Sequence, residues 1–160
     1  MANNTNNTSD VVYLTADGRR RLEEEFERLT TVERSALAER LNVAIKDGDL
    51  SENAAYTAAK EDQGHLEGRI AHIQASLRRA VLIDERGGTG KVALGSRVTV
   101  EDEDGEMTYQ IVGPMEADPR QGRISNESPV GRALLDHAAG DEVSFETPGG
   151  TTAMRIVSVA

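Results

Sequence analysis

The sequence predicts an α+β protein: an N-terminal antiparallel α-helical coiled-coil hairpin followed by a small antiparallel sheet domain with one helix. Apolar residues recur at helical spacing through the first half of the chain. Beyond residue 91 many of them alternate with polar residues, which is the period of a strand. A glycine-rich stretch separates the two patterns. We therefore expect a disordered tail over 1–10, the hairpin over 11–83, a linker over 84–91 and the sheet domain over 92–160.

The first helix is expected to begin after Thr15 and to stop at Gly48. Thr15 is a good N-cap, and Asp17 places a negative charge in the first turn. Glycine directly after the last periodic residue is typical of a helix end. The apolar stripe between them is regular at first and less regular later: Leu22, Phe26, Leu29, Val32, Ala36, Leu37, Leu41, Ala44 and Ile45.

The second helix has a clearer period. We expect it from about residue 52 to residue 81, which makes it about 45 Å long. Its seam alternates steps of three and four residues, as in a heptad, through Tyr56, Ala59, Gln63, Leu66, Ile70, Ile73, Leu77 and Ala80. Two helices with facing stripes and a tight connection at Gly48 must fold back on each other.

The second half predicts short strands and one helix. A turn over 102–105, flanked by alternating apolar residues, predicts a hairpin. Ser128 and Pro129 form a cap and first-turn pair that opens a short helix. A strand around Val143 and Phe145, a turn over 148–150 and a last strand to residue 159 complete the domain.

Charge and composition exclude several classes of function. The net charge is −10: residues 1–84 carry 11 basic and 15 acidic side chains, and residues 85–160 carry 7 and 13. Neither half has the basic excess of a protein that neutralises DNA phosphates, so a protein is the expected main partner. The absence of cysteine excludes disulfides and thiolate sites. Without a bilayer-length apolar run or a signal peptide, we expect a cytoplasmic protein with no membrane partner.

The connection between the two predicted helices carries two carboxylates, Asp49 and Glu52, three residues apart. One interpretation is a capping box, which would satisfy free N–H groups at the start of the second helix. The other is functional. Two carboxylates do not hold Mg²⁺ tightly alone, but they can complete a metal site in a partner's phosphoryl-transfer centre. The spacing alone leaves both interpretations open.

The run GDLSENAAYTAAKEDQGHLEGRI, residues 48–70, closely resembles the signature of the Gre-type bacterial transcription elongation factors, the GreA/GreB family. YLTADGRRRLEEEFERL resembles the family's opening segment, and GSRVTVEDEDGEMTYQIVG, SPVGRALLDHAAGDEV and PGG resemble its C-terminal domain. The resemblance covers about residues 11–159 and is nearer to the GreA branch. It implies an N-terminal coiled coil and an FKBP-like C-terminal domain.

The resemblance also implies a function. The C-terminal domain would dock on bacterial RNA polymerase near its secondary channel, and the coiled coil would enter that channel. Asp49 and Glu52 would assist the second Mg²⁺ of the polymerase, which then cleaves the 3′ end of backtracked RNA and so rescues arrested complexes. The chain would not be an enzyme itself. It would bind no cofactor tightly, use Mg²⁺ of the polymerase active site, meet the nascent RNA 3′ end only indirectly, and act as a monomer.

Further positions follow from the same resemblance. The positions that would shape the tip are Gly48, Leu50, Ser51, Asn53 and Tyr56, although the seam position of Tyr56 equally favours packing. The candidates for contact with RNA are Arg40, Lys46 and Lys60. Ala55 and Thr57 depart from the family, which commonly has an acid and a histidine there. These departures leave the basic face thin.

The same residues also bear on three alternative functions. A channel-binding regulator without cleavage stimulation is the main alternative, but such a protein would be expected to lose the tip acids. A prolyl isomerase needs an aromatic pocket, and residues 85–160 offer only Tyr109 and Phe145. A plain coiled-coil adaptor would have no use for the tip motif. The three histidines, His65, His72 and His137, show no metal-ligand spacing.

Overall fold

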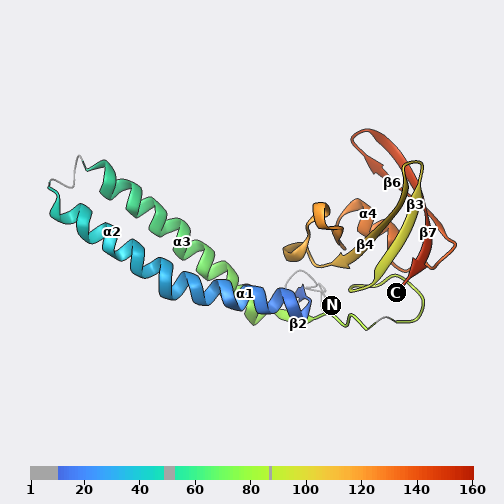
Figure 1. The fold of residues 1–160 in the computed structure, drawn as a ribbon, viewed down its shortest axis with the longest axis horizontal. Coiled ribbons are helices and arrows are strands. Elements are labelled where there is room, and N and C mark those ends of the chain that lie inside the picture. The colour runs from blue at the N-terminus through green and yellow to red at the C-terminus, as the bar shows by residue number, and fades with distance from the viewer. Residues whose placement is uncertain (1–10, 49–52, 87) are drawn as a thin grey trace, which may run out of the picture. The chain divides into compact units, whose positions relative to one another are not determined.

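The computed structural model describes residues 11–48, 53–86 and 88–160, which form two compact units (Figure 1). The arm unit comprises Arg19–Arg79 and is helical. The sheet unit combines the chain up to Gly18 with Ala80–Ala160 and contains the strands. The α+β class is therefore confirmed, whereas the predicted domain boundaries stay predictions. Among the described residues, no helix has the length and apolarity that crossing a membrane requires.

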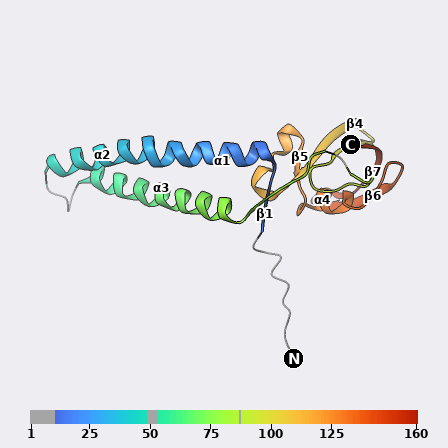
Figure 2. The same ribbon diagram turned by 90° about the horizontal axis from the view of Figure 1, so that it is seen from below.

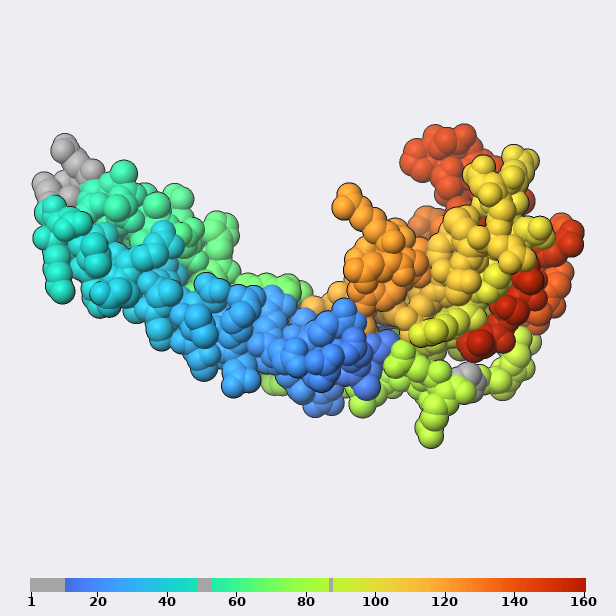
Figure 3. Space-filling view, viewed as in Figure 1, coloured from blue at the N-terminus to red at the C-terminus, as the bar shows by residue number. Residues whose placement is uncertain are grey.

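The arm unit is built from two antiparallel helical segments. The first segment is continuous and consists of α1 (Ala16–Arg28), the π-helical turn η2 (Leu29–Glu33) and α2 (Arg34–Lys46); the second is α3 (Ala54–Arg78). Ion pairs join the segments in reverse order along the chain: Arg69–Glu25 at 2.8 Å, Arg34–Glu67 at 2.7 Å and Arg40–Asp62 at 2.9 Å. In the space-filling view, α2 and α3 lie against each other (Figure 3).

The π turn explains why the apolar stripe of the first segment is irregular. Leu29, Leu37 and Ala44 are all buried. Leu37 lies eight residues after Leu29, which in a regular α-helix would turn it about 80° away. The wider turn absorbs one residue, so both side chains face α3. Val32 and Ile45, expected in the stripe, are instead 60% and 50% exposed, and Ala36 is exposed too.

The seam of α3 agrees with the prediction over most of its length. Ala59, Ile70 and Ile73 are buried, and Tyr56, Gln63, Leu66 and Leu77 are partly buried. Ala80 is a correction, because α3 ends at Arg78 and β2 (Ala80–Leu82) follows. The backbone there pairs in parallel with β1 (Val12–Leu14), and Ile83 N donates to Leu14 O at 2.8 Å. Its 25 residues give α3 a length of about 37 Å.

The sheet unit contains a five-stranded sheet in the order β5-β4-β3-β7-β6. Its elements are β3 (Arg97–Asp102), β4 (Gly105–Val112), the 3₁₀ turns η3 (Pro114–Glu116) and η4 (Pro119–Gln121), β5 (Arg123–Ser125), α4 (Pro129–Leu134), β6 (Glu142–Thr147) and β7 (Gly150–Val159). All neighbouring strands are antiparallel except β4 and β5, which are parallel. The expectation of a purely antiparallel sheet is corrected by this short strand, which returns after the two 3₁₀ turns.

One hydrophobic core holds the sheet unit together. It consists of Val92, Val98, Val100, Ile111, Ile124, Leu134, Val143, Met154 and Ile156. Helix α4 contributes Leu134 to this core and lies near β6 (Figure 2). Its predicted cap is confirmed, because Ser128 Oγ accepts a hydrogen bond from Gly131 N at 3.0 Å. The predicted turns over 102–105 and 148–150 also connect their strands as expected.

A buried hydrogen-bond cluster ties the start of α1 to η3 within the sheet unit. Thr15, 4% exposed, caps α1 as predicted, since its Oγ1 accepts from Gly18 N at 3.0 Å. Thr15 N and Thr15 Oγ1 each donate to one carboxylate oxygen of Glu116, both at 2.6 Å. The three groups satisfy one another over a sequence separation of 101 residues.

The first prediction concerns Gly18. Replacing glycine by alanine within a helix usually stabilises it by up to about 1 kcal/mol. At Gly18 a Cβ would overlap the carboxylate of Glu116 and displace it from Thr15. We expect Gly18→Ala to lower the free energy of unfolding of the sheet unit by about 1–3 kcal/mol, measured by urea denaturation. In a Glu116→Ala background the same substitution should cause no further loss; an equal loss there would contradict the explanation.

The second prediction concerns the ion pair between Arg69 and Glu25. Hydrogen bonds from Arg69, with distances of 2.8 and 2.9 Å, lower the pKa of the Glu25 carboxyl. A lowered folded-state pKa stabilises the arm above the pKa of the unfolded chain, and the effect is lost as pH falls through the folded value. Arg69→Met should therefore lower the melting temperature slightly at pH 7, and this deficit should shrink as the pH falls through the folded pKa of Glu25. A deficit that stays constant over this change of pH would assign the effect to packing.

Candidate functional site

The candidate site lies at the end of the arm unit where α2 stops and α3 begins. Asp47 N donates to Val43 O at 3.2 Å, and Gly48 follows with a φ of +137°, which favours glycine. The predicted helix stop at Gly48 is therefore confirmed. Four of the site positions predicted from the resemblance, Asp49, Leu50, Ser51 and Glu52, lie outside the described residues, so their roles stay predictions.

Asn53 links the two helices at this end. Its Oδ1 accepts a hydrogen bond from Tyr56 N at 3.1 Å, which makes Asn53 the N-cap of α3. Its Nδ2 donates to Ala44 O in the last turns of α2 at 2.6 Å. One side chain thus fixes the start of α3 and holds it against α2. Sequence reasoning placed Asn53 at the tip but did not foresee this second bond.

The cap at Asn53 bears on the capping-box interpretation of Asp49 and Glu52, two residues that lie outside the described part of the chain. A capping box would require Asp49 at the N-cap of α3 and Glu52 inside its first turn. Helix α3 begins at Ala54, after a cap that follows both acids. The N-cap that the structure shows for α3 is Asn53, and the roles of Asp49 and Glu52 stay predictions.

Tyr56 occupies the first turn of α3 and is partly buried. It lies between the cap at Asn53 and Ala59, which is 1% exposed and belongs to the seam. On the facing helix, Ala44 is 3% exposed. Small buried residues on both helices let the backbones approach closely at this end. The position of Tyr56 is compatible with both roles considered for it.

The basic candidates are exposed, and two of them bond to neighbours. Arg40 pairs with Asp62 across the arm at 2.9 Å, with both side chains more than half exposed. Lys60 Nζ donates to Gln63 Oε1 at 2.8 Å. Lys46 is exposed at the last turn of α2. These cations are spread over two helices among acids such as Asp47, Glu61 and Asp62, and their contact with RNA stays a prediction.

The perturbed acids of the arm belong to ion pairs between its helices. Hydrogen bonds from Arg34, at 2.7 and 2.8 Å, lower the pKa of Glu67 as those from Arg69 lower that of Glu25. Both pairs cross between the two segments at exposed or partly exposed positions. Their geometry is that of structural links and not of a general acid or base.

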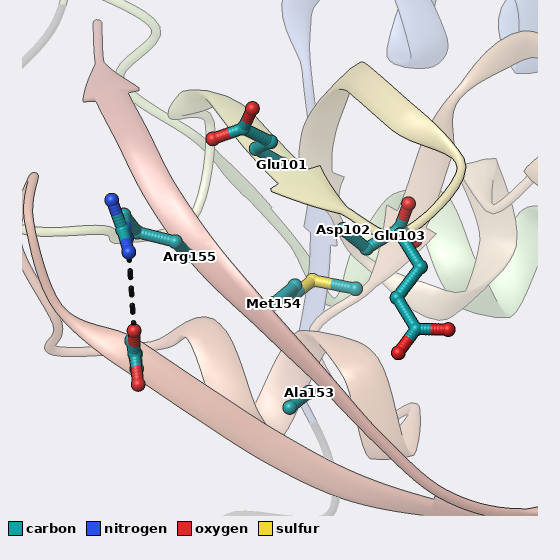
Figure 4. Close-up of a pocket in the computed structure, with 7 residues that line it drawn as sticks. Glu101, Asp102, Glu103, Ala153, Met154 and Arg155 are labelled. Carbon is teal, nitrogen blue, oxygen red and sulfur yellow. Dashed lines mark hydrogen bonds and ion pairs between the residues drawn. The ribbon is translucent and has the colours of Figure 1, made fainter.

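A second candidate is an open, acidic hollow of about 360 Å³ in the sheet unit (Figure 4). Its walls are Glu101, Asp102, Glu103, Glu142, Ala153, Met154 and Arg155. Arg155 Nη2 lies 3.4 Å from Glu142 Oε1, as the dashed line in Figure 4 marks. Sequence reasoning read the run of acids only as a turn. The hollow offers carboxylates and one arginine but no nucleophile.

Metal binding and acid chemistry find little support elsewhere in the described part of the chain. No group of three or more histidine, cysteine or acidic side chains is arranged there to hold a metal ion. Burial, with a contribution from Asp102, raises the pKa of the Tyr109 hydroxyl, which keeps it protonated. The end of the arm remains the stronger candidate.

Comparison with known families covers almost the whole chain. The family profile described as "Transcription elongation factor, N-terminal" matches residues 12–82. The profile described as "Transcription elongation factor, GreA/GreB, C-term" matches residues 87–160. The two matches meet near the start of the predicted linker.

Individual relatives agree with the family profiles. Transcription elongation factor GreA of Roseiflexus sp. (strain RS-1) is 52% identical over 150 residues, which are 92% of this chain and 96% of the relative. Transcription elongation factor GreA of Bacillus subtilis (strain 168) is 45% identical over 152 residues, 94% and 97% of the two chains.

Two solved structures are also similar in sequence. GreA factor homolog 1 of Thermus thermophilus is 33% identical, with 94% of this chain and 99% of that chain covered at a TM-score of 0.39. The GreA/GreB factor of Nitrosomonas europaea is 27% identical, with 93% and 98% covered at a TM-score of 0.40. The family profiles and the curated relatives, which span nearly the full chain, place this protein in the GreA/GreB family of transcription elongation factors.

Proposed function

We propose that this protein enters the secondary channel of bacterial RNA polymerase and stimulates the polymerase's own Mg²⁺-dependent cleavage of the 3′ end of backtracked RNA. Cleavage gives an arrested complex a usable RNA end. The protein has no independent active site in this proposal. It acts as a monomer in the cytoplasm, binds no cofactor tightly and meets the nascent RNA only through the polymerase.

The observation that carries the proposal is the cap at Asn53. It starts α3 at Ala54, and the residue that fills the N-cap position is neither Asp49 nor Glu52. Helix α3 provides about 37 Å of length behind this connection, enough for the end of a narrow arm to act inside a large partner. We propose that the arm unit is the family's coiled coil and that this end is its active tip.

The donor set fits the proposed use of Mg²⁺. Mg²⁺ prefers carboxylate oxygens, keeps several waters and usually shares its ligands with phosphates or other side chains. Asp49 and Glu52 supply carboxylates but too few for a complete site, which suits ligands that are added to a partner's centre. Two metal ions in such centres stabilise the attacking and leaving oxygens of a phosphoryl transfer. The contribution of this chain is to hold two carboxylates in place.

The sheet unit is proposed to dock the protein on the polymerase as an FKBP-like domain. Its core is well packed, with Val98, Ile111 and Ile156 fully buried, so it can serve as a rigid support. The acidic hollow around Met154 is not assigned to this contact. An isomerase activity is not proposed, because Tyr109 and Phe145 remain the only aromatic residues of residues 85–160.

A channel-binding regulator without cleavage stimulation is the second candidate. The observation in its favour is the thin basic face, since Arg40 and Lys60 already bond to Asp62 and Gln63. Such bonds are exposed and are therefore weak enough to exchange for an RNA phosphate. Both candidates require binding to the polymerase, and they differ in whether bound protein accelerates cleavage.

The third prediction tests the acidic pair. Asp49→Ala with Glu52→Ala should reduce the rate of transcript cleavage in a defined backtracked complex by about a hundredfold or more, because metal ligation contributes several kcal/mol. Binding to the polymerase should stay nearly unchanged, as measured by competition with labelled wild-type protein.

The matched control is Glu61→Ala, which removes an exposed carboxylate from α3 outside the tip. This variant should stimulate transcript cleavage to the same rate as the wild type. Unfolding of the arm in the double variant would return the pair to a structural role. Wild-type protein that binds but accelerates no cleavage would establish the second candidate instead.

The fourth prediction tests the link made by Asn53. Asn53→Asp keeps an acceptor for Tyr56 N but loses the donor to Ala44 O, whereas Asn53→Ala loses both. We expect Asn53→Ala to destabilise the arm by about 1–2 kcal/mol, and Asn53→Asp to destabilise it less. Both should slow cleavage about tenfold at low Mg²⁺, with partial recovery at high Mg²⁺. If Asn53→Asp stimulated cleavage at the wild-type rate, the hydrogen bond to Ala44 O would be dispensable.

A further inference from the structure

The first helical segment of the arm is weakened at η2. Arg34 N donates to Leu29 O, five residues back, where an α-helix would use the fourth. Side-chain hydroxyl groups donate hydrogen bonds to backbone carbonyls around the turn. These bonds are Thr30 Oγ1 to Phe26 O at 2.8 Å, Thr31 Oγ1 to Glu27 O at 2.7 Å and Ser35 Oγ to Thr31 O at 2.8 Å. Such back-bonding slightly destabilises helices and often bends them. Wide turns of this type are also a recognised cause of kinks.

The second segment is weakened by two glycines, Gly64 and Gly68, inside α3. Both are exposed, and a Cβ at either position would meet no atom of the described residues within 4 Å beyond the nearby helix backbone. Packing within the arm therefore does not require glycine at these positions. Glycine inside a helix lowers its stability relative to alanine. The sequence thus retains two flexible residues where alanine would fit.

Turn η2 and Gly68 lie at the same level of the arm. The bidentate pairs Arg69–Glu25 and Arg34–Glu67 bracket it on both segments. Turn η2 lies between Glu25 and Arg34, and Gly68 lies between Glu67 and Arg69. Gly64 is one helical turn further toward the tip. A helical pair that is weakened in both members at one level bends most easily there.

A small hydrophobic cluster can serve as the pivot. Leu29, the first residue of η2, is buried with Ile70 and Ile73 of α3. The bracketing ion pair of Arg34 and Glu67 is about half exposed on both sides, so stretching it costs little. The buried contacts hold the segments together while the outer contacts allow a change of angle.

We propose that η2, Gly64 and Gly68 form a hinge, here called the arm joint, at which the tip half of the arm bends relative to its base. The tip half consists of α2 and the start of α3. Use of this bending to place the carboxylates rests on the proposed function; the bending itself does not. The arm joint lets the tip adjust its position without breaking the hydrophobic cluster.

Two kinds of variant stiffen the arm joint from opposite sides. Gly64→Ala with Gly68→Ala should raise the melting temperature of the arm by roughly 2–4 °C per glycine. Deletion of Val32, an exposed residue of η2, should convert the π turn into regular α-helix and keep Leu29 and Leu37 facing α3. Gly88→Ala is the matched control, since Gly88 also has open space around it but lies in the sheet unit.

Bending is measured by the distance between two spin labels on either side of η2. The chain contains no cysteine, so Glu24→Cys and Asn42→Cys, both exposed, can be labelled uniquely. We expect a broad distance distribution in the otherwise wild-type arm and in Gly88→Ala. Both stiffened arms should give a narrower one. An equally narrow distribution in the wild type would overturn the proposal.

A second experiment tests function and uses the protein together with the polymerase. Both stiffened variants should bind the polymerase normally. The polymerase should then cleave backtracked RNA on the order of tenfold more slowly than with the wild type. If only the glycine variant is slow, the glycines form a contact face for the partner and the arm joint is rejected. If the wild type does not stimulate cleavage, the proposed function fails, and the spin-label distances still decide whether the arm joint exists.

Discussion

The arm unit has a single hydrophobic seam, and this constraint governs most of its structure. Two helices in contact bury one stripe each, without a third layer to compensate for a misplaced residue. The seam must therefore stay in register over the length of α3. Turn η2 keeps Leu37 and Ala44 facing α3 after Leu29. The cross-helix ion pairs, exposed and individually weak, set the relative position of the helices more than they stabilise them.

The same constraint explains why the tip needs a dedicated link. Large buried side chains such as Leu29, Ile70 and Ile73 lie nearer the base, whereas the buried residues close to the tip are Ala44 and Ala59. Little apolar area is available there to hold the helices together. Asn53 supplies a polar substitute, since one side chain caps α3 and bonds to α2. The link therefore holds the two helices together where their apolar contacts are small.

Local chemistry made much of the fold predictable from the sequence. Thr15 and Ser128 cap their helices as their side chains indicate, and Gly48 adopts the backbone that a helix end requires. The π turn was not predicted, because a fixed helical period cannot reveal one absorbed residue. The end of α3 was missed because Ala80–Leu82 pair with Val12–Leu14, far away in sequence. The cap of α3 was not predicted, because the sequence analysis considered only Asp49 and Glu52 for a capping box, whereas the structure shows Asn53 at the N-cap.

The pairing of β1 with β2 has a consequence for the order of events during synthesis. Parallel neighbours need a long crossover connection, and here the crossover contains the whole arm. The contacts of the arm all lie within residues 19–79, so it can fold while the ribosome is still making the rest of the chain. Thr15 has to wait for Glu116, 101 residues later. The sheet unit is thus completed only after Glu116 has been made, when β1 already has its partner β2 and the arm is already folded.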